Sequence, residues 1–386
     1  MLIIDKKELT RFSAPHRLWQ GIPGIEVTKK GRIFATFYSG GTREQFGNFA
    51  MVVVSDDGGA TFSEPIAVAY EDEARCFDPV LWIDPMGRLW FTWSCSSRTK
   101  GSMVWGSVCD DPDADTLVFG DVFPIGKYVM MNKPTVLSTG EWLFPVAVWD
   151  SSIKIDGLPP EEYGQPIEEG GAFVYKKADD GFTFEKRGGV VAPERSCDEQ
   201  MVVELSDGRL WMLIRAKYGI ASSYSHDKGH TWTDARDSGI PCPCTRFHIR
   251  RLRSGRLLLV NHYDFDGRNN LTALLSEDEG KTWPYKLLFD GRMNVSYPDA
   301  VEADDGYIYI TYDRERGGFG KSLEGVLSAA REILYARVTE DDILAGKLIS
   351  EGSRLGCIIS KLGEYVDGDP FAQEKGETVG PAGQNG

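Results

Sequence analysis

The chain has 386 residues, with 43 Lys and Arg against 58 Asp and Glu, and a formal net charge of -15. Such a charge repels phosphate backbones and anionic lipid, so we expect neither nucleic acid nor a membrane as a partner. No stretch reaches the roughly 18 uninterrupted apolar residues of a membrane span, and the apolar run at the N-terminus is too short for a signal peptide. We therefore expect a cytoplasmic protein.

The cysteines also limit the possible chemistry. There are seven of them, an odd and scattered set that suits a reducing compartment better than a disulfide framework. The pair Cys242 and Cys244 is too closely spaced for a zinc site, and no second pair follows it. We expect no catalytic metal and no cofactor, and the many aromatic residues with little helical periodicity indicate an all-β chain.

A repeat runs along the chain. At six places a polar turn ends in Gly and is followed by an apolar strand, and another short apolar strand precedes each turn; the glycines are Gly31, Gly87, Gly140, Gly208, Gly255 and Gly306. Gly takes positive φ without steric cost, and the β-branched and aromatic residues that follow suit a strand. Each repeat therefore predicts a β-hairpin.

A second motif follows most of these hairpins. The segments Ser55–Phe62, Ser225–Trp232 and Ser276–Trp283 fit the pattern S-x-D-x-G-x-T-[WF], known as the Asp-box. Asp can cap its own turn, Gly can take the left-handed position, and the aromatic ring can pack beneath. Turn chemistry accounts for every fixed position, so we interpret these boxes as structural and not as catalytic.

Six units of about 50 residues predict an all-β fold, a six-bladed β-propeller. We expect residues 1–350 to form this single domain, with the N-terminal segment completing the outer strand of the last blade. Residues 351–386 form a C-terminal extension whose Gly- and Pro-rich end we expect to be disordered. An insertion at 150–171 in the third unit is either a lid over the site or a disordered acidic loop.

The first strand of a propeller blade lines the central channel, so the residues at its start form a ring on one face. This ring includes Asp78, Glu199, Arg246, His248 and Tyr297. The second strand returns to the same face, which brings Arg215 close to Glu199. In so acidic a chain, gathering Arg215, Arg246 and Arg268 toward one rim suggests that an anionic group is held there.

These segments resemble the sialidase (neuraminidase) superfamily, over most of the chain from about residue 22 to 344. DEQMVVELSDGRLWMLIR resembles the strands that carry the catalytic Glu and the second Arg of an arginine triad, here Glu199 and Arg215. RNNLTALLSEDEGKTW resembles the stretch with the third Arg, here Arg268. NVSYPDAVEADDGYIYITYD resembles the segment of the nucleophilic Tyr, here Tyr297, with Pro298 in place of the usual Ser.

Two parts of the family pattern differ in this chain. Where the family has Arg-Ile-Pro near the start, this chain has Gly21 followed by Ile-Pro, so the first Arg of the triad is missing unless Arg17 or Arg43 replaces it. The loop that should offer an acidic Asp contains Glu44 as its only carboxylate, and Asp78 is the reserve acid.

The resemblance implies an exo-acting glycoside hydrolase that removes a terminal acidic sugar by a retaining mechanism. Its expected catalytic residues are Tyr297, Glu199 and Glu44, and its expected substrate-binding residues are Arg215, Arg268, Arg246, Asp78 and His248. Carbohydrate is the expected partner, and the oligomeric state is left open.

Other interpretations of the same residues remain. The protein is alternatively a divergent glycosidase or lyase for a uronic acid or rhamnose, with His248 or His262 in acid-base work, or a non-catalytic carbohydrate-binding propeller. Glu199 with Arg215 is alternatively a structural ion pair, and Tyr297 a packing residue.

Overall fold

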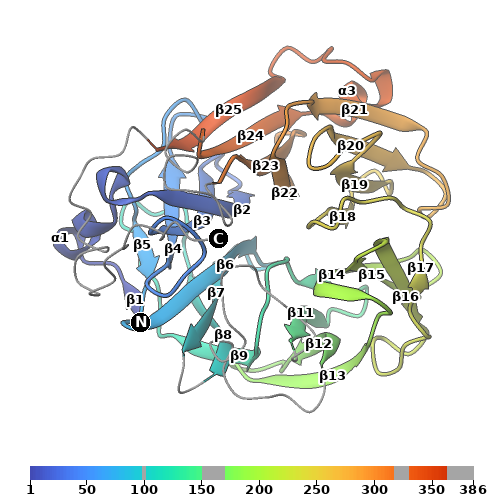
Figure 1. The fold of residues 1–386 in the computed structure, drawn as a ribbon, viewed down its shortest axis with the longest axis horizontal. Helices are drawn as coiled ribbons and strands as arrows, with labels where there is room; N and C mark the ends of the chain where they lie inside the picture. The colour runs from blue at the N-terminus through green and yellow to red at the C-terminus, as the bar shows by residue number, and fades with distance from the viewer. Residues whose placement is uncertain (98–100, 150–169, 317–329, 363–386) are drawn as a thin grey trace, which may run out of the picture.

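The chain folds into a ring of six antiparallel β-sheets, which confirms the predicted all-β, six-bladed propeller (Figure 1). The computed structural model describes residues 1–97, 101–149, 170–316 and 330–362. The predicted insertion at 150–171 falls almost wholly outside these residues, as does the end of the C-terminal extension.

Each blade is built from consecutive strands, ordered from the channel outward. The first three blades are β2 (Trp19–Val27), β3 (Ile33–Gly40), β4 (Phe49–Ser55) and β5 (Ala67–Ala69); β6 (Ala74–Ile83), β7 (Leu89–Ser97), β8 (Gly101–Cys109) and β9 (Phe123–Lys127); and β10 (Thr135–Val136), β11 (Trp142–Val148), β12 (Gly171–Lys177) and β13 (Phe184–Val190).

The last three blades repeat this order. They are β14 (Arg195–Glu204), β15 (Leu210–Ala216), β16 (Gly219–Ser225) and β17 (Arg236–Asp237); β18 (His248–Arg251), β19 (Leu257–His262), β20 (Leu271–Ser276) and β21 (Tyr285–Asp290); and β22 (Val295–Glu302), β23 (Ile308–Arg314), β24 (Glu332–Val338) and β25 (Arg354–Lys361).

The sixth blade is completed by its own C-terminal strand, so the expected role of the N-terminal segment was wrong. Strand β25 pairs with β24, while the N-terminal strand β1 (Leu2–Ile3) pairs with β5 on the outer edge of the first blade. Between β24 and β25 the chain turns back through the short helix α3 (Glu340–Ala345). This helix begins with a capping box at Thr339 and ends at Gly346, which has the left-handed conformation. The propeller therefore continues past residue 350.

Helices are few and short. Besides α3, the described part of the chain has α1 (Lys6–Leu9) and two 3-10 turns, Thr10–Phe12 and Ala14–His16. None of its helices is long and apolar enough to cross a membrane.

Neighbouring blades are joined by buried hydrophobic clusters, one at each of the six contacts around the ring. The cluster between the sixth blade and the first contains Ile25 and Phe37 from one side and Tyr309 and Tyr335 from the other. Burial of apolar surface between blades, at roughly 25 cal/mol per Å², therefore closes the ring without a shared strand.

The S-x-D-x-G-x-T-[WF] turns have the structural geometry expected of them. In the fourth blade, Asp227 accepts hydrogen bonds from the backbone N–H (2.8 Å) and the hydroxyl (2.6 Å) of Thr231. These bonds hold the pKa of Asp227 down to about 2. The turn of the first blade packs on the sixth, where the Tyr335 hydroxyl donates to the carbonyl of Gly59 at 3.2 Å.

This packing predicts different costs for two adjacent glycines. Gly58 and Gly59 both have positive φ, but a Cβ at Gly58 meets nothing within 4 Å, whereas one at Gly59 collides with the Tyr335 hydroxyl. We expect Gly58→Ala to lower the free energy of unfolding by about 1 kcal/mol, and Gly59→Ala by about 2 to 4 kcal/mol. Urea denaturation measures both, and equal losses would contradict a role for this turn in joining the blades.

Candidate active site

Four inner strands carry a bulge near their start, at the end of the channel where Glu199 and Tyr297 lie. The pairing register shifts between Gly21 and Gly24, Phe77 and Val80, Asp198 and Met201, and Ser296 and Asp299. At these bulges Ile22, Asp78, Glu199 and Tyr297 have φ between 45° and 56°. Left-handed backbone costs such residues on the order of 1 kcal/mol each and is concentrated at functional sites.

Glu199, Arg215 and Tyr297 meet at the mouth of the channel. The Tyr297 hydroxyl donates to Glu199 Oε1 at 3.0 Å, and Arg215 Nη1 donates both to that oxygen and to the Tyr297 hydroxyl, the latter at 3.0 Å. Glu199 is 3% exposed and Tyr297 6%. The predicted proximity of Glu199 and Arg215 is confirmed, and Tyr297 joins them from the sixth blade.

The environment of Tyr297 keeps its hydroxyl protonated. Burial, followed by the charge of Glu199, raises the pKa of Tyr297 above its usual value, against the opposing effect of Arg215, Arg268 and Arg316. A phenol is a weak nucleophile, so it needs a base within hydrogen-bond reach. Glu199 occupies that position.

Besides Arg246, whose guanidinium carbon lies 5.7 Å from the centre of the Tyr297 ring, three guanidinium groups surround the Tyr297 side chain. Arg215 contacts its hydroxyl, while the guanidinium carbons of Arg268 and Arg316 lie 5.5 Å and 4.5 Å from the centre of its ring. Arg268 donates to the carbonyl of Cys244 at 3.4 Å. The structure thus brings the predicted Arg268 to the site and adds Arg316 to it.

Glu44 lies beside this group in a buried ion-pair network. Its Oε2 accepts a hydrogen bond from Arg75 Nη2 at 2.8 Å, and its Oε1 lies 3.5 Å from Arg316 Nη1. Arg75 also donates to the Tyr38 hydroxyl at 2.8 Å. Both oxygens of the expected acid therefore face guanidinium groups.

Asp78 is the second carboxyl group available as an acid. Burial, reinforced by the nearby charges of Glu44 and Glu199, raises the pKa of Asp78 to about 8, although Arg75 opposes the shift. Its side chain is 2% exposed, and its Oδ1 has no hydrogen-bond partner among the described residues. The raised pKa favours the protonated form of Asp78 at neutral pH.

Arg246 holds the channel together, which corrects its expected place as a substrate-binding residue. It is 1% exposed, and its guanidinium donates to backbone carbonyls of three other blades. The acceptors are Pro298 (3.1 Å), Met131 (2.9 Å), Pro23 (2.7 Å) and Tyr297 (3.0 Å). Because these donors are occupied by backbone carbonyls, they are not available to a ligand. Arg246 therefore stabilises the backbone of the bulges.

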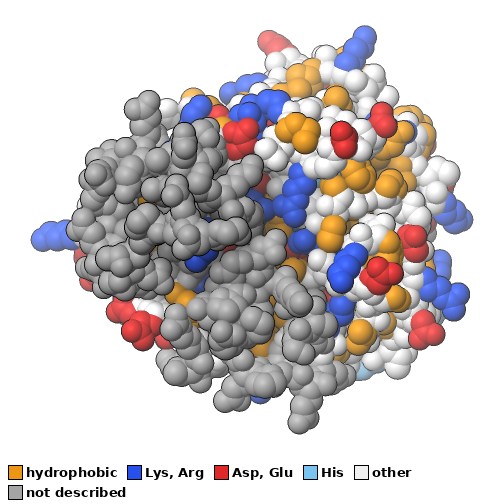
Figure 2. Space-filling view, in the orientation of Figure 1, with side chains coloured by type: hydrophobic (Ala, Val, Ile, Leu, Met, Phe, Trp, Pro, Cys, Tyr) orange, Lys and Arg blue, Asp and Glu red, His pale blue; other side chains and the backbone are white. Residues whose placement is uncertain are grey.

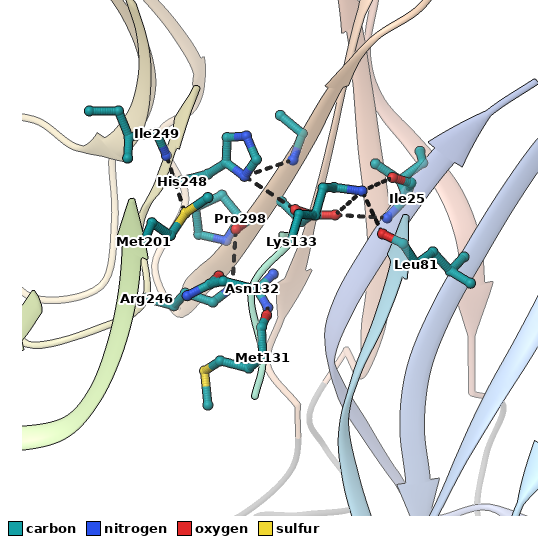
Figure 3. A network of polar contacts seen from close by, with 12 residues as sticks. Ile25, Leu81, Met131, Asn132, Lys133, Met201, Arg246, His248, Ile249 and Pro298 are labelled. Atoms are coloured by element: carbon teal, nitrogen blue, oxygen red, sulfur yellow. Dashed lines mark hydrogen bonds and ion pairs between the residues drawn. The ribbon is translucent and has the colours of Figure 1, made fainter. Parts of the chain in front are cut away.

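His248 was also expected to contact the substrate, but it lies in the interior of the protein. Its Nδ1 is 3.2 Å from Asp299 Oδ1 and accepts from the backbone N–H of Ala300 at 3.3 Å (Figure 3). Burial lowers the pKa of His248 despite the nearby Asp299. Its neighbour Lys133 binds Glu26 Oε1 (2.6 Å), Asp299 Oδ2 (3.1 Å) and two backbone carbonyls.

The other residues considered from the sequence lie away from this group. Nδ1 of the buried His262 lies 2.5 Å from the carbonyl of Asn269, and burial lowers the pKa of His262 to about 4. Arg17 binds Gln20 (3.3 Å) and Ser360 (3.4 Å), and Arg43 is exposed. Within the described residues, neither arginine contacts Glu199 or Tyr297.

Two arginines of the site were missed in the sequence. Arg75 precedes Asp78 by three residues on the same inner strand, and Arg316 follows Asp313, the return-strand residue of the sixth blade. A search of the residues beside each ring position would have found Arg75. No local pattern marks Arg316, because its place depends on how the sixth blade meets the first.

The site lies at one end of the channel, and the opposite end holds a separate cavity. This cavity of ≈ 460 Å³ is lined by Lys133, His248 and Arg250, and by the ends of β14 and β18. It lacks the Tyr and carboxylate pair, so we place the candidate site at the bulged ends of the inner strands. On the face seen in Figure 2, Lys and Arg side chains border the middle of the ring beside atoms drawn in grey.

The site combines groups that can transfer protons with fixed cations. Across the described residues, no three His, Cys, Asp or Glu side chains group in a way that could hold a metal ion. The arrangement offers a buried phenol in contact with a carboxylate, a protonated carboxyl group and several fixed cations. Such a set can transfer protons and hold an anion.

Comparison with known proteins gives one family match and one match to a characterised relative. The family of BNR repeat-like domains matches residues 31–310. A sialidase from Micromonospora viridifaciens is 30% identical over 135 residues, which cover 31% of this chain and 20% of that protein. The aligned part thus spans about a fifth of the length of this curated relative.

Solved structures share the fold over most of the chain. A sialidase from Streptococcus pneumoniae has a TM-score of 0.64 at 14% identity, covering 86% of this chain and 70% of that one. An intramolecular trans-sialidase from leech has a TM-score of 0.66 at 14% identity, with the same coverage of 86% and 70%. At such identities the likeness concerns the architecture alone.

The position of Arg246 predicts that it is a structural residue. Arg246→Met removes the donors of four buried carbonyls, and we expect it to lower the free energy of unfolding by about 3 to 5 kcal/mol. The control is Arg253→Met, because Arg253 is exposed and its ion pairs lie at the surface; its expected cost is under about 1 kcal/mol. Thermal and urea unfolding measure both, and equal stability of the two variants would contradict this role.

Proposed function

Because this chain belongs to the family of BNR repeat-like domains and has the sialidase-like propeller fold, we propose that it is an exo-acting glycoside hydrolase that releases a terminal acidic sugar. The observation that carries the proposal is the 3.0 Å hydrogen bond from the Tyr297 hydroxyl to Glu199 Oε1. A nucleophile in contact with its base is the minimum that a double displacement requires. The Tyr nucleophile is a known exception among glycosidases, found in sialidases.

In the first step, the Tyr297 oxygen attacks the anomeric carbon while its proton passes to Glu199. The bond to the leaving oxygen breaks, and that oxygen takes a proton from a carboxyl group of the enzyme. Arg215 contacts both Glu199 and Tyr297, so its charge stabilises the negative charge that develops on the phenolic oxygen.

In the second step, water attacks the anomeric carbon of the glycosyl-tyrosine. The carboxylate left by the first step takes a proton from the water, and Glu199 returns its proton to the Tyr297 oxygen as that bond breaks. Two displacements at one carbon retain its configuration. Both catalytic carboxyl groups end the cycle in their starting protonation states.

Two carboxyl groups compete for the role of proton donor. Glu44 is the acid expected from the sequence, but both its oxygens face guanidinium groups. Asp78 has a pKa of about 8 and an oxygen without a partner among the described residues. An acid must hold its proton at working pH, so Asp78 is the better supported donor.

The proposed substrate class rests on the cations around Tyr297. Arg215 and Arg268 come from the fourth and fifth blades; Arg215 contacts the Tyr297 hydroxyl, and the guanidinium carbon of Arg268 lies 5.5 Å from the centre of the Tyr297 ring. A guanidinium binds a carboxylate with two parallel hydrogen bonds. A neutral phenol as nucleophile, in place of a carboxylate, also lets an anionic sugar approach without added repulsion.

The alternative functions have less support. A lyase that uses His248 or His262 at this site would need an imidazole beside Tyr297 and Glu199, whereas His248 lies beside Asp299 at the opposite cavity and His262 faces the carbonyl of Asn269. A carbohydrate-binding propeller would need neither the Tyr297 and Glu199 contact nor the left-handed backbone at both residues.

The nucleophile and its base are tested by conservative substitutions. We expect Tyr297→Phe and Glu199→Gln each to lower kcat/KM by about 10³-fold or more, measured as sugar release from aryl glycosides that include a sialoside and a glucuronide. Tyr285→Phe is the control, because Tyr285 lies on the outer strand β21. Full activity of Tyr297→Phe would contradict the double-displacement mechanism. Efficient hydrolysis of neutral sugars that is retained in Arg215→Ala would contradict the proposal of an acidic substrate.

The proton donor is identified by the leaving group. A glycoside with an activated aryl leaving group needs little protonation, so we expect Asp78→Asn to retain activity on it while losing about 10² to 10⁴-fold on an alkyl glycoside. Glu44→Gln showing that pattern instead would assign the role to Glu44.

The pH profile gives an independent check of Asp78. Since its pKa is raised from 3.8 to about 8, kcat/KM on alkyl glycosides should fall as the pH rises through about 8, and Asp78→Asn should lack this limb. The protonated group also stabilises the fold; this contribution is complete below about pH 4 and is lost as the pH rises through about 8. Unfolding free energies from pH 4 to 9 should therefore decline less in Asp78→Asn than in the wild type.

A further inference from the structure

We infer that Arg316, from the sixth blade, takes the place of the arginine missing from the first blade and binds the carboxylate of the substrate. This inference rests on the proposed function. Gly21 stands where the family pattern has the first Arg of its triad. The structure places the Arg316 side chain in the space that a side chain at position 21 would enter.

The two positions exclude each other sterically. A Cβ built on Gly21 collides with Arg316 Cδ and lies 2.7 Å from Arg316 Cγ. Real Cβ atoms do not approach other heavy atoms so closely, and these two carbons belong to the middle of the Arg316 side chain. Glycine at position 21 is therefore the condition for Arg316 to reach the channel mouth.

The main chain fixes the two segments against each other. The backbone N–H of Gln20 donates to the carbonyl of Arg316 at 3.4 Å, and the N–H of Ile22 donates to Asp313 Oδ2 at 2.8 Å. Asp313 also accepts from the Ser296 hydroxyl at 3.0 Å, beside Tyr297. The bulge at Gly21 and the end of the sixth blade thus form one unit.

The guanidinium of Arg316 packs against the ring of Tyr297. Its central carbon lies 4.5 Å from the centre of the Tyr297 ring, the shortest such distance among the arginines around that ring. Glu44 (3.5 Å) and Asp313 (3.7 Å) lie beside it and hold its orientation. Arg215, Arg268 and Arg316 then surround the nucleophile from the fourth, fifth and sixth blades.

A clamp of three arginines has an electrostatic reason here. Glu44, Asp78, Glu199 and Asp313 all lie at the channel mouth, so an anionic sugar entering it would meet carboxyl groups on several sides. Arg75 is engaged with Glu44 and Tyr38. Without Arg316, the described residues would leave Arg215 and Arg268 to face the incoming carboxylate, since the donors of Arg246 are used by backbone carbonyls.

The test compares a glycoside that carries a carboxylate with its carboxamide, which has nearly the same shape but no charge and one acceptor oxygen fewer. We expect Arg316→Ala to raise KM for the acidic glycoside by about 10- to 100-fold, the effect of one charged hydrogen bond, and to change KM for the carboxamide by less than about threefold. Direct binding of the corresponding free acid, measured by calorimetry, should weaken by a similar factor. Arg316→Lys keeps the positive charge but lacks the planar guanidinium that binds a carboxylate with two hydrogen bonds. Its KM for the acidic glycoside should lie between those of the wild type and Arg316→Ala.

Because a side chain at position 21 and the side chain of Arg316 cannot occupy the same space, matched variants can be made at these two positions. Gly21→Ala should displace Arg316 and reproduce part of the loss on the acidic glycoside. Gly21→Arg with Arg316→Ala moves the guanidinium to the first blade and should recover most of the preference for the carboxylate. Gly21→Arg alone should be less stable than this double variant, as thermal unfolding will show.

The outcomes separate this inference from the proposed function. A wild-type protein that neither binds nor hydrolyses any acidic glycoside rejects the proposed function, and the inference with it. A wild type that does so, with Arg316→Ala retaining its preference for the carboxylate, overturns the role of Arg316 alone. Equal losses of activity on both glycosides, together with a shifted pH profile of kcat, would show that Arg316 only positions Glu44. If Arg316→Ala does not fold, the same comparison is made with Arg316→Lys and Gly21→Ala.

Discussion

The site depends on a buried cation in the channel. Bulges at the inner strands aim Asp78, Glu199 and Tyr297 at the channel mouth, but a bulge leaves backbone carbonyls without partners in the sheet. Arg246 donates to the carbonyls of Pro23, Tyr297 and Pro298, which all lie at or beside such bulges. An unpaired buried carbonyl costs about 1 to 3 kcal/mol, so this one side chain stabilises the strained backbone of several blades together. Lys133 likewise donates to the backbone carbonyls of Ile25 and Leu81, farther along the inner strands (Figure 3).

The carboxyl groups at the channel mouth and in the layer beneath it lie in different electrostatic environments. Burial and two neighbouring carboxylates keep Asp78 protonated, whereas Glu199 holds an ion pair with Arg215. In the layer beneath, burial acts against ionisation of Asp299, but Lys133 and His248 hold its pKa below the usual value. Under the proposed function, these environments would separate a proton donor from a proton acceptor, the arrangement that acid-base catalysis at neutral pH requires.

The ring architecture allows a side chain from one blade to occupy space that belongs to a position in another blade. Inner strands of six blades begin at the same channel mouth, so a given point in space can be reached from either of two neighbouring blades. Gly21 and Arg316 are nearly 300 residues apart in sequence, a separation of the order expected when the last blade of a propeller meets the first. The closure between these blades rests on packing of Tyr309 and Tyr335 and on the contacts of Asp313. The site and the closure of the ring therefore involve the same contact.

The sequence by itself determined the repeat, and with it the blades, the turns and the strand starts. These follow from local patterns: glycine after a polar turn, apolar alternation, and Asp-capped turns each encode their own geometry. It also predicted that Glu199 meets Arg215, because a hairpin returns the chain to the level it left. Only the tertiary structure decided that Arg246 and His248 face the interior, that β25 completes the last blade, and that Arg316 fills the space over Gly21. Those outcomes depend on bulges that no residue type marks, and on contacts between segments that only ring closure brings together.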